Sequence, residues 1–292
     1  VRKLAREFGV ELGQVSGTGP HQRILKEDVQ AYVKRQMQQA QGKGVTGGAL
    51  PGVRLPDFAQ FGPIERRPLS RLQWLTAENM QRSWLNVPHV TQFDEADITE
   101  LEAFRVRQKP VGQARGIGLT VLPFLLKACA RVLQELPQFN VSLDLERRER
   151  VQKQYVHIGI AVDTPAGLVV PVIRDVDQKG IWVLAEEAQA LAAKARDKKL
   201  TPAEMQGACF TITSLGGIGG TAFTPIVNTP EVAILGVSRA AMKPVWEDGQ
   251  FVPRLMLPLS LSYDHRAVNG ADGARFTVRL AQLLGDVREL LM

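Results

Sequence analysis

The sequence predicts an α/β protein with a mixed β-sheet packed as a sandwich, preceded by a small helical unit. Helix and strand patterns are interspersed through residues 63–292, without the regular strand–helix repeat or the glycine fingerprint of a doubly wound fold. The chain has 292 residues and is 45% hydrophobic, which suffices to bury a substantial core. We therefore expect a small domain over residues 1–37, a flexible linker rich in Gly, Gln and Pro over 38–62, and a main domain over 63–292.

The small domain is expected to act as a docking surface. Its two helix patterns run from Val1 to Phe8 and from Lys26 to Arg35, and residues 1–37 carry seven Lys or Arg against four Asp or Glu. A unit of this size has little core, which is typical of a docking surface. The alternative is that these are ordinary solvated charges.

The first elements of the main domain follow from capping residues and apolar spacing. Ser70 can cap a helix that runs to Trp84, and residues 87–97 read as an extended segment. Thr99 with Glu102 forms a capping-box pattern at the start of a second helix. Apolar spacing then predicts a buried helix over 120–136.

The middle of the main domain alternates between strand and helix signals. Asp248-Gly249 predicts a tight β-hairpin. The remaining assignments are strands at 155–162 and 168–173, a helix at 181–196, a short helix after Thr201-Pro202, and strands at 209–214 and 232–237.

The last elements frame a solitary histidine. Residues 255–263 alternate in polarity as a strand does, and the end of this strand delivers His265 to a sheet edge. Asn269-Gly270 marks a turn, after which apolar residues recur at helical spacing to the C-terminus. Imidazole suits proton transfer at neutral pH. The structural alternative is a histidine that merely hydrogen-bonds beside Asp264 and Arg266.

Several blocks of the sequence resemble one enzyme family. His265, Asn269 and Gly270 lie in DHRAVNG, which is similar to the DHRxxDG signature of the dihydrolipoamide acyltransferases, the core enzymes of the 2-oxo acid dehydrogenase complexes. The segments at 83–102, 154–177 and 207–238 also read as blocks of that family, and the first 29 residues resemble its subunit-binding domain. The resemblance implies a trimeric fold like that of chloramphenicol acetyltransferase, with active sites between neighbouring subunits.

The resemblance also implies roles for individual residues. His265 would be the general base, and Thr213 replaces a serine whose hydroxyl usually stabilises the tetrahedral intermediate, with Ser214 as the alternative donor. Asn269 replaces the more common Asp, so it can orient neighbouring groups but cannot carry charge. The coenzyme A arm is expected along Thr213, Ser214, Leu215 and Gly216.

Thioester exchange explains why these residue types suffice. Free thiols have a pKa of about 8.5 and react as thiolates, so a base is required. Imidazole would take the proton from coenzyme A and return it to dihydrolipoamide sulfur. Because one thiol replaces another, no acyl-enzyme is needed, and the sequence shows no GxSxG or Cys-His pattern for one.

The segment SWLNVPHVTQF and the lack of a succinyltransferase-like SLPTFNEV segment favour an acetyl-transferring member that serves pyruvate dehydrogenase.

The same resemblance implies partners. Arg2, Arg6 and Arg23 would contact acidic patches on the pyruvate decarboxylase and dihydrolipoamide dehydrogenase subunits. Leu291 and Met292, at an apolar terminus, would join homotrimers into a cubic core of twenty-four subunits. The chain begins with Val1, and we expect a bacterial, cytoplasmic protein whose lipoyl group is carried on an upstream domain.

Composition weighs against other classes of function. The net charge of +6, from 36 basic and 30 acidic residues, is widely spread, so we expect no nucleic-acid partner. The longest apolar stretch, 119–133, is too short and too charged for a bilayer span, and Cys129 and Cys209 offer neither metal-ligand spacing nor a disulfide framework. The alternatives that stay open are a succinyl or branched-chain acyltransferase, a catalytically silent scaffold, and an antibiotic-acetylating enzyme.

Overall fold

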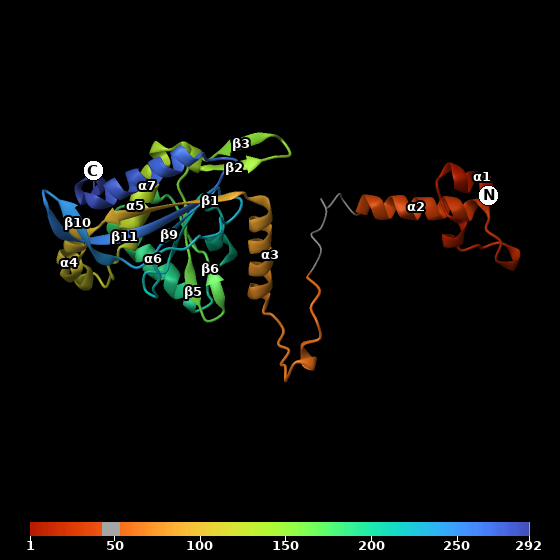
Figure 1. The fold of residues 1–292 in the computed structure, drawn as a ribbon, viewed down its shortest axis with the longest axis horizontal. Coiled ribbons are helices and arrows are strands. Elements are labelled where there is room, and N and C mark those ends of the chain that lie inside the picture. Colours follow the sequence, from red (N-terminus) through yellow and green to blue (C-terminus); the bar gives the residue numbers. More distant parts are fainter. Residues whose placement is uncertain (43–52, 292) are drawn as a thin grey trace. The chain divides into compact units, whose positions relative to one another are not determined.

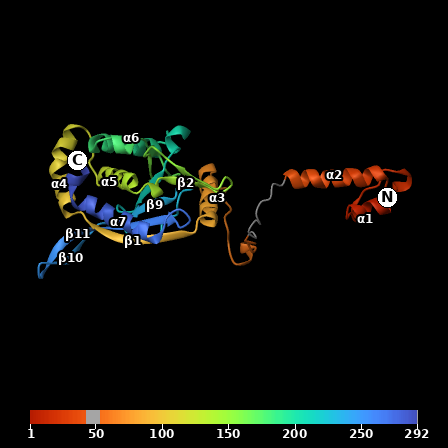
Figure 2. The same ribbon diagram turned by 90° about the horizontal axis from the view of Figure 1, so that it is seen from above.

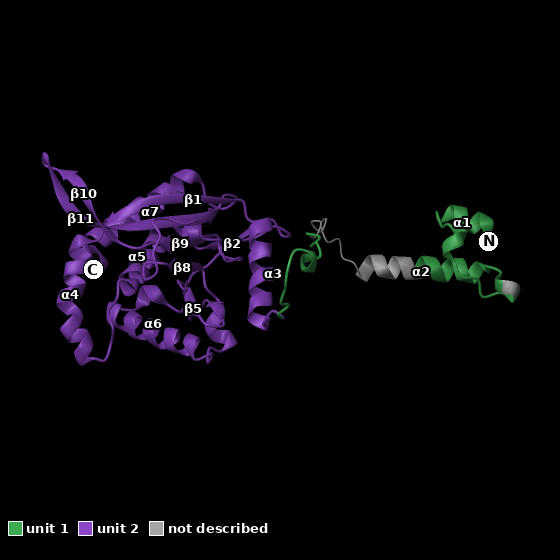
Figure 3. Cartoon of the chain, turned by 60° about the horizontal axis from the view of Figure 1, so that its bottom comes forward, with its two compact units in different colours: residues 1–67 green, residues 68–292 purple. Residues whose placement is uncertain are grey.

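The chain forms two compact units. The computed structural model describes residues 1–42 and 53–291, and only the backbone of residues 21, 35–42 and 291. Unit 1 comprises Val1–Arg67 and unit 2 comprises Pro68–Met292 (Figure 3). Ala5, Val15 and Val29 are buried in unit 1, whereas all residues of the large apolar cluster belong to unit 2.

Unit 1 is a small helical domain held by a buried carboxylate. Its helices are α1 (Arg2–Glu7) and α2 (Lys26–Gly42), with short 3-10 turns at Leu12–Gln14, Pro20–Gln22 and Phe58–Gln60. Asp28 accepts hydrogen bonds from the backbone N–H of Leu25 and from the backbone and hydroxyl of Thr18, and these bonds lower its pKa. Because α2 continues to Gly42, the linker predicted over 38–62 begins inside this helix, and its residues 43–52 lie outside the described residues.

Unit 2 is built on a mixed sheet, as predicted. The sheet has the strand order β1-β11-β9-β8-β4-β7. The seventh strand, β10, pairs with β11 outside this order. β11 is antiparallel to both β1 and β9, whereas β8 is parallel to both β9 and β4. The strands of this sheet are β1 (His89–Asp97), β4 (Ile158–Ile160), β7 (Val172–Ile173), β8 (Phe210–Ser214), β9 (Ala233–Val237), β10 (Ala241–Glu247) and β11 (Gln250–Asp264).

Helices cover one face of this sheet. Figure 2 shows α5, α6 and α7 on the same side of β1 and β11, while α3 stands beside the sheet (Figure 1). A single large apolar cluster lies between the layers, and within it Phe276 contacts both Phe139 and Phe210. The helices are α3 (Arg71–Asn86), α4 (Thr99–Ala114), α5 (Leu122–Glu135), α6 (Ile181–Arg196), α7 (Gly270–Gly285) and α8 (Val287–Leu291).

Local sequence signals explain most of these boundaries. Ser70 caps α3 in a reciprocal box with Gln73, as its position predicted. The box predicted for Thr99 and Glu102 is wrong, because Asp97 accepts hydrogen bonds from both the backbone N–H and the hydroxyl of Thr99. Glu102 instead pairs with Arg105 at 2.7 Å.

The predicted hairpin at Asp248-Gly249 is confirmed. Both residues have positive φ, 49° and 85°, as a two-residue hairpin turn requires. The hairpin of β10 and β11 projects from the body of unit 2 (Figure 3). Two short antiparallel pairs complete the unit: β2 (Val141–Asp144) with β3 (Glu149–Gln152), and β5 (Val162–Thr164) with β6 (Gly167–Val169).

Candidate functional site

His265 lies directly after the end of β11, on an exposed turn. Its backbone N–H donates to the carbonyl of Pro88 at 3.1 Å, and its ring lies 6.0 Å from that of Tyr263. The preceding residue, Asp264, donates its N–H to the carbonyl of Val232 at 2.8 Å. The main chain is therefore fixed on both sides of β11 while the imidazole stays exposed to solvent.

The neighbours of His265 stabilise this turn. Asp264 is 2% exposed and accepts hydrogen bonds from the Arg266 side chain, the shortest of them 2.7 Å. This pair is structural, because the carboxylate faces the guanidinium and the backbone N–H of Arg266. Asn269 is exposed and precedes α7, where its side chain makes no capping hydrogen bond. The amide of Asn269 is therefore available for another partner.

Two other histidines have structural roles. The His89 Nε2 atom accepts from the N–H of Val227 at 3.0 Å, and its Nδ1 lies 2.8 Å from the carbonyl of Val87, so both ring nitrogens are occupied. The His157 Nδ1 atom accepts from the N–H of Asp175 at 3.0 Å. Both rings hold loops together, in contrast to the exposed ring at position 265.

Thr213 lies near the end of β8, half-buried and paired in register with Gly236 of β9. The next residue, Ser214, is exposed, and its hydroxyl accepts from the N–H of Gly216 at 3.3 Å. The N–H of Leu215 donates to the carbonyl of Val237. The four residues predicted to contact coenzyme A therefore form the strand end and the turn that follows it.

A cavity of about 610 Å³ adjoins this turn. Ser214 and Gly216 line it together with apolar residues of β9, β11 and α5, and the ion pair of Glu102 and Arg105 lies at its wall. The hydrogen bond from Arg105 lowers the pKa of Glu102. Ser238 also lines the cavity, where its hydroxyl is buried and has no hydrogen-bond partner among the described residues. The sequence offered no signal for Ser238 beyond its place after a strand.

Within one chain, Thr213 and His265 lie at opposite ends of the sheet. Thr213 is in register with Gly236, and Gly236 with Ser260. His265 follows Ser260 by five positions, which corresponds to roughly 17 Å along the strand. A single copy therefore does not bring the predicted base and the predicted hydroxyl donor together.

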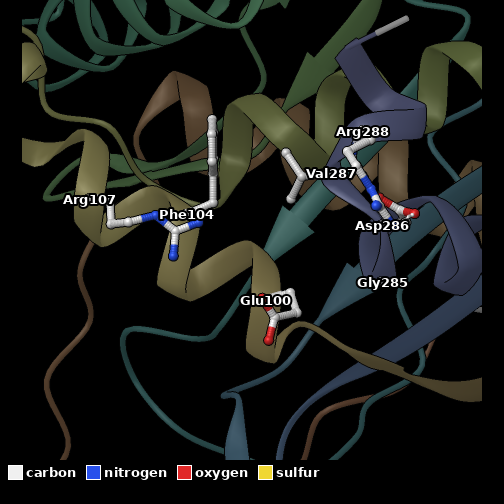
Figure 4. A pocket seen from close by; sticks show the side chains of 7 residues that line it. All are labelled: Glu100, Phe104, Arg107, Gly285, Asp286, Val287 and Arg288. Carbon is white, nitrogen blue, oxygen red and sulfur yellow. Dashed lines mark hydrogen bonds and ion pairs between the residues drawn. The ribbon is translucent and has the colours of Figure 1, made fainter.

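A second cavity lies near the C-terminus. It has a volume of about 490 Å³ and is lined by residues of α4 and of the junction between α7 and α8 (Figure 4). Asp286 and Arg288 form an ion pair of 2.7 Å there.

Of the two predicted assembly residues, Leu291 ends α8 with only its backbone described, and Met292 lies outside the described residues.

The predicted docking arginines lie in unit 1. Arg2 and Arg6 belong to α1, and Arg23 follows the second 3-10 turn; all three are exposed.

In residues 1–42 and 53–291, no helix is both long and apolar enough to cross a membrane. The same described residues contain no group of three or more His, Cys, Asp or Glu that could hold a metal ion.

Two parts of the sequence match known families. Residues 61–292 match the family described as 2-oxoacid dehydrogenases acyltransferase (catalytic domain), and residues 1–30 match the e3 binding domain. The dihydrolipoyllysine-residue acetyltransferase component of the pyruvate dehydrogenase complex of Pseudomonas aeruginosa is 63% identical, over 100% of this chain and 54% of the relative. The same component from Azotobacter vinelandii is 64% identical, over 100% and 46%. The chain spans about half the length of these relatives.

Two solved structures resemble the chain. One comes from a study of the roles of a serine, a histidine and an asparagine in the catalytic mechanism of Azotobacter vinelandii dihydrolipoamide acetyltransferase; it has a TM-score of 0.82 and 64% identity, covering 83% of this chain and 100% of that one. The other is the cubic core of the pyruvate dehydrogenase multienzyme complex, with a TM-score of 0.82, 65% identity and the same coverage. The sequence likeness therefore extends to the fold.

Proposed function

Because the chain belongs to the 2-oxoacid dehydrogenase acyltransferase family, we propose that it transfers an acetyl group between dihydrolipoamide and coenzyme A. We further propose that it forms the structural core of a pyruvate dehydrogenase complex. The relatives from Pseudomonas aeruginosa and Azotobacter vinelandii, at 63% and 64% identity over the whole chain, are acetyltransferase components of that complex. Their high identity supports the acetyl group over the succinyl or branched-chain alternatives.

The exposed imidazole of His265 is the observation that carries this proposal. Its backbone is fixed by the carbonyl of Pro88, whereas both ring nitrogens of His89 are already occupied by the protein. An imidazole at this position can take the proton of the coenzyme A thiol while the sulfur attacks the acetyl carbonyl. When the tetrahedral intermediate collapses, the bond to the dihydrolipoamide sulfur breaks, and the imidazole returns the proton to that sulfur.

Thr213 is proposed to stabilise the oxyanion of this intermediate. The serine, histidine and asparagine studied in the Azotobacter vinelandii enzyme are separated by the same sequence intervals as Thr213, His265 and Asn269. A threonine hydroxyl can donate the hydrogen bond that a serine donates, although its methyl group restricts the rotamer. Ser214, which is exposed at the next position, is the alternative donor.

The separation of Thr213 from His265 supports a site shared between two copies. Each chain would supply His265 to one neighbour and Thr213 to the other, which a cyclic trimer satisfies. Exposed aromatic residues also favour self-association, because Trp74 and Trp84 on α3 and Phe93 on β1 are 56%, 64% and 49% exposed. The likeness to a cubic core supports the further assembly of such trimers into twenty-four subunits.

The cavity beside Ser214 and Gly216 is proposed to hold part of the coenzyme A arm. Its apolar walls suit the methylene groups of pantetheine, and the unpartnered hydroxyl of Ser238 can hydrogen-bond an amide of the arm. Leu215 would contact the arm from the intervening turn.

Unit 1 is proposed to recruit the other enzymes of the complex. The match of residues 1–30 to the e3 binding domain supports docking of the dihydrolipoamide dehydrogenase or decarboxylase subunits. Arg2, Arg6 and Arg23 are exposed and can form bidentate contacts with carboxylates. Leu291 and Met292 are proposed to join trimers. A lipoyl domain elsewhere in the protein and a place in the bacterial cytoplasm complete the proposal.

An acyl-transfer assay tests this function. Purified assemblies are given free dihydrolipoamide with acetyl-CoA, with succinyl-CoA or with a branched acyl-CoA, and chloramphenicol is offered as a rival acceptor. We expect acetyl-dihydrolipoamide to form fastest. Preference for another acyl-CoA would assign a different member of the family, and absence of transfer from every donor would indicate a scaffold.

A further inference from the structure

A buried carboxylate, Glu231, lies outside the proposed chemistry. It is 3% exposed and immediately precedes Val232, whose carbonyl holds the main chain beside His265. Its Oε2 accepts from the hydroxyl of Thr211 at 2.7 Å, and its Oε1 accepts from the side-chain amide of Asn228 at 3.0 Å. A buried carboxylate is costly to retain unless such partners satisfy it.

The hydrogen bond from Thr211 connects Glu231 to β8, the strand that contains Thr213. Thr211 and Thr213 lie two positions apart on β8, so their side chains project from the same face of the sheet. Glu231 therefore fixes the strand that carries the proposed oxyanion donor.

The segment around Glu231 also forms a backbone hydrogen bond next to His265. The carbonyl of Val232 accepts from the N–H of Asp264 at 2.8 Å, one residue before His265. On its other side, the carbonyl of Pro230 accepts from the hydroxyl of Ser142 at 2.6 Å. A shift of residues 230–232 would thus move the backbone from which the imidazole projects.

The same segment is tied to α3. Thr229 and Ser83 contact each other through their hydroxyls at 3.0 Å, and the side-chain amide of Asn79 donates to that of Asn228 at 3.1 Å. Among the described residues, Glu231 is the one side chain of segment 228–232 that accepts a hydrogen bond from β8. Its carboxylate therefore adds a side-chain link between this loop and β8, beyond the backbone pairing of β8 with β9.

The charges around Glu231 are few. Burial raises its pKa to about 7, against the hydrogen bonds from Thr211 and Asn228 and the charge of Lys153. Lys153 is itself partly buried, which lowers its pKa, and the thiol of Cys209 is the other titratable neighbour. The network survives either protonation state, because a neutral carboxyl can donate to the Thr211 hydroxyl while it accepts from Asn228.

We propose that Glu231 is a positioning residue for acyl transfer, which holds the backbones of Thr213 and His265 in the geometry that the shared site requires. This inference rests on the proposed function. Glu231 touches neither substrate. Its role is to keep the two ends of the sheet aligned, so that each chain presents both of its groups correctly to its neighbours.

Matched variants test this role. Glu231→Gln keeps the shape, one acceptor and one donor, so it can retain both hydrogen bonds if the Thr211 hydroxyl turns to accept. Glu231→Ala removes both bonds, and Thr211→Val removes only the link to β8. Thr277→Val serves as the control, because Thr277 is equally buried and its hydroxyl bonds only within α7.

The readout is kcat and KM per assembled particle, with particle size checked by sedimentation. We expect Glu231→Ala and Thr211→Val to lower kcat by about tenfold to a hundredfold, the scale of a misplaced reacting group, with KM unchanged. Glu231→Gln and Thr277→Val should keep the kcat of the unmodified protein. Should Glu231→Ala fail to assemble, Thr211→Val carries the test.

Two results would overturn the inference. A normal kcat in assembled Thr211→Val particles would show that the link to β8 does not position the site. An equal loss of kcat in Glu231→Gln and Glu231→Ala would show that charge, and not hydrogen bonding, is what matters. Neither result resembles failure of the proposed function, in which the unmodified protein itself would transfer no acetyl group.

Discussion

The two ends of strand β9 present different surroundings for chemistry. At its start, His265 stands exposed on a turn that backbone hydrogen bonds to Pro88 and Val232 fix from both sides. At its end, Thr213 is half-buried beside a cavity of about 610 Å³ with apolar walls. One end offers an exposed imidazole as proton acceptor, and the other offers a cavity lined by hydroxyl groups.

This difference supports the proposal that each end is half of a site. General-base catalysis requires the base within about 3 Å of the proton that it takes, whereas the two ends of one chain are separated by roughly 17 Å along the sheet. The exposure of the imidazole is explained if it enters the cavity of a second copy. The following experiments test this arrangement, in order of decreasing expected effect on the rate of acetyl transfer.

Removal of the imidazole should have the largest effect. We expect His265→Ala to lower kcat by about a hundredfold to ten-thousandfold, the range for loss of a general base, while the particles keep their size. The assay is acetyl transfer from acetyl-CoA to dihydrolipoamide, with sedimentation to check assembly.

His157→Asn is the matched control for that variant. An asparagine side-chain oxygen can replace Nδ1 as the acceptor for the N–H of Asp175, so activity should be kept. Full activity in His265→Ala would show that His265 is not the general base.

Removal of the hydroxyl at the other end should come second. We expect Thr213→Val to lower kcat by about a hundredfold to a thousandfold, as for loss of one oxyanion donor, and Thr213→Ser to keep it. If Ser214→Ala is impaired instead and Thr213→Val is not, the donor is the neighbouring hydroxyl.

Co-expression of the two impaired variants tests whether the site is shared. In mixed assemblies of His265→Ala and Thr213→Val chains, some sites receive an intact imidazole from one copy and an intact hydroxyl from the next. We expect activity well above that of either variant alone, measured on tagged mixed particles. Activity no higher than the sum of the parents would indicate that each site lies within one chain.

Much of the fold could be predicted because local chemistry determines it. The bounds 181–196 of α6 agree with the prediction, and the cap at Ser70 and the hairpin at Asp248-Gly249 each depend on residues adjacent in sequence. Thr99 misled the prediction, because a nearby acceptor, Asp97, replaced the expected one. The hairpin of β2 and β3 was missed, since its second strand is exposed throughout and has no alternating pattern.

The site was less predictable because it depends on contacts between distant segments. His265 and Thr213 carry recognisable chemistry, yet their separation follows from the register of three strands, which no local pattern encodes. Ser238 and Glu231 gave no local signal, because the roles proposed for them rest on burial beside a cavity and on a hydrogen bond between distant segments.

The third single substitution concerns Asn269, which lies beside the His265 turn. Its side chain does not cap α7, so Asn269→Ala should leave the free energy of unfolding unchanged within about 0.5 kcal/mol. If its amide orients a reacting group, kcat should fall by about tenfold, equivalent to one hydrogen bond. A loss of stability with normal kcat would reverse this assignment.

The smallest effect on rate is expected for Glu231→Gln, whose effect should lie in the pH dependence of stability. Burial raises the pKa of Glu231 from 4.5 to about 7, so the folded chain keeps a proton that the unfolded chain releases. The stability that this group contributes is present below pH 4.5 and is lost as the pH rises through 7. We therefore expect the free energy of unfolding of Glu231→Gln, relative to that of the unmodified chain, to increase by up to about 3 kcal/mol between pH 4.5 and pH 8. Denaturant unfolding of both proteins measures this difference.

Glu204→Gln is the control for this measurement because its shift has the opposite sign. The hydrogen bond from Lys194 and those from Thr201 lower the pKa of Glu204 to about 2, so its contribution is present above pH 4.5 and is lost only as the pH falls toward 2. Between pH 5 and pH 8 the difference between this variant and the unmodified chain should stay constant. A constant difference for Glu231→Gln as well would mean that its carboxylate is already ionised in the folded chain, and that β8 is linked to segment 228–232 by a permanent charge.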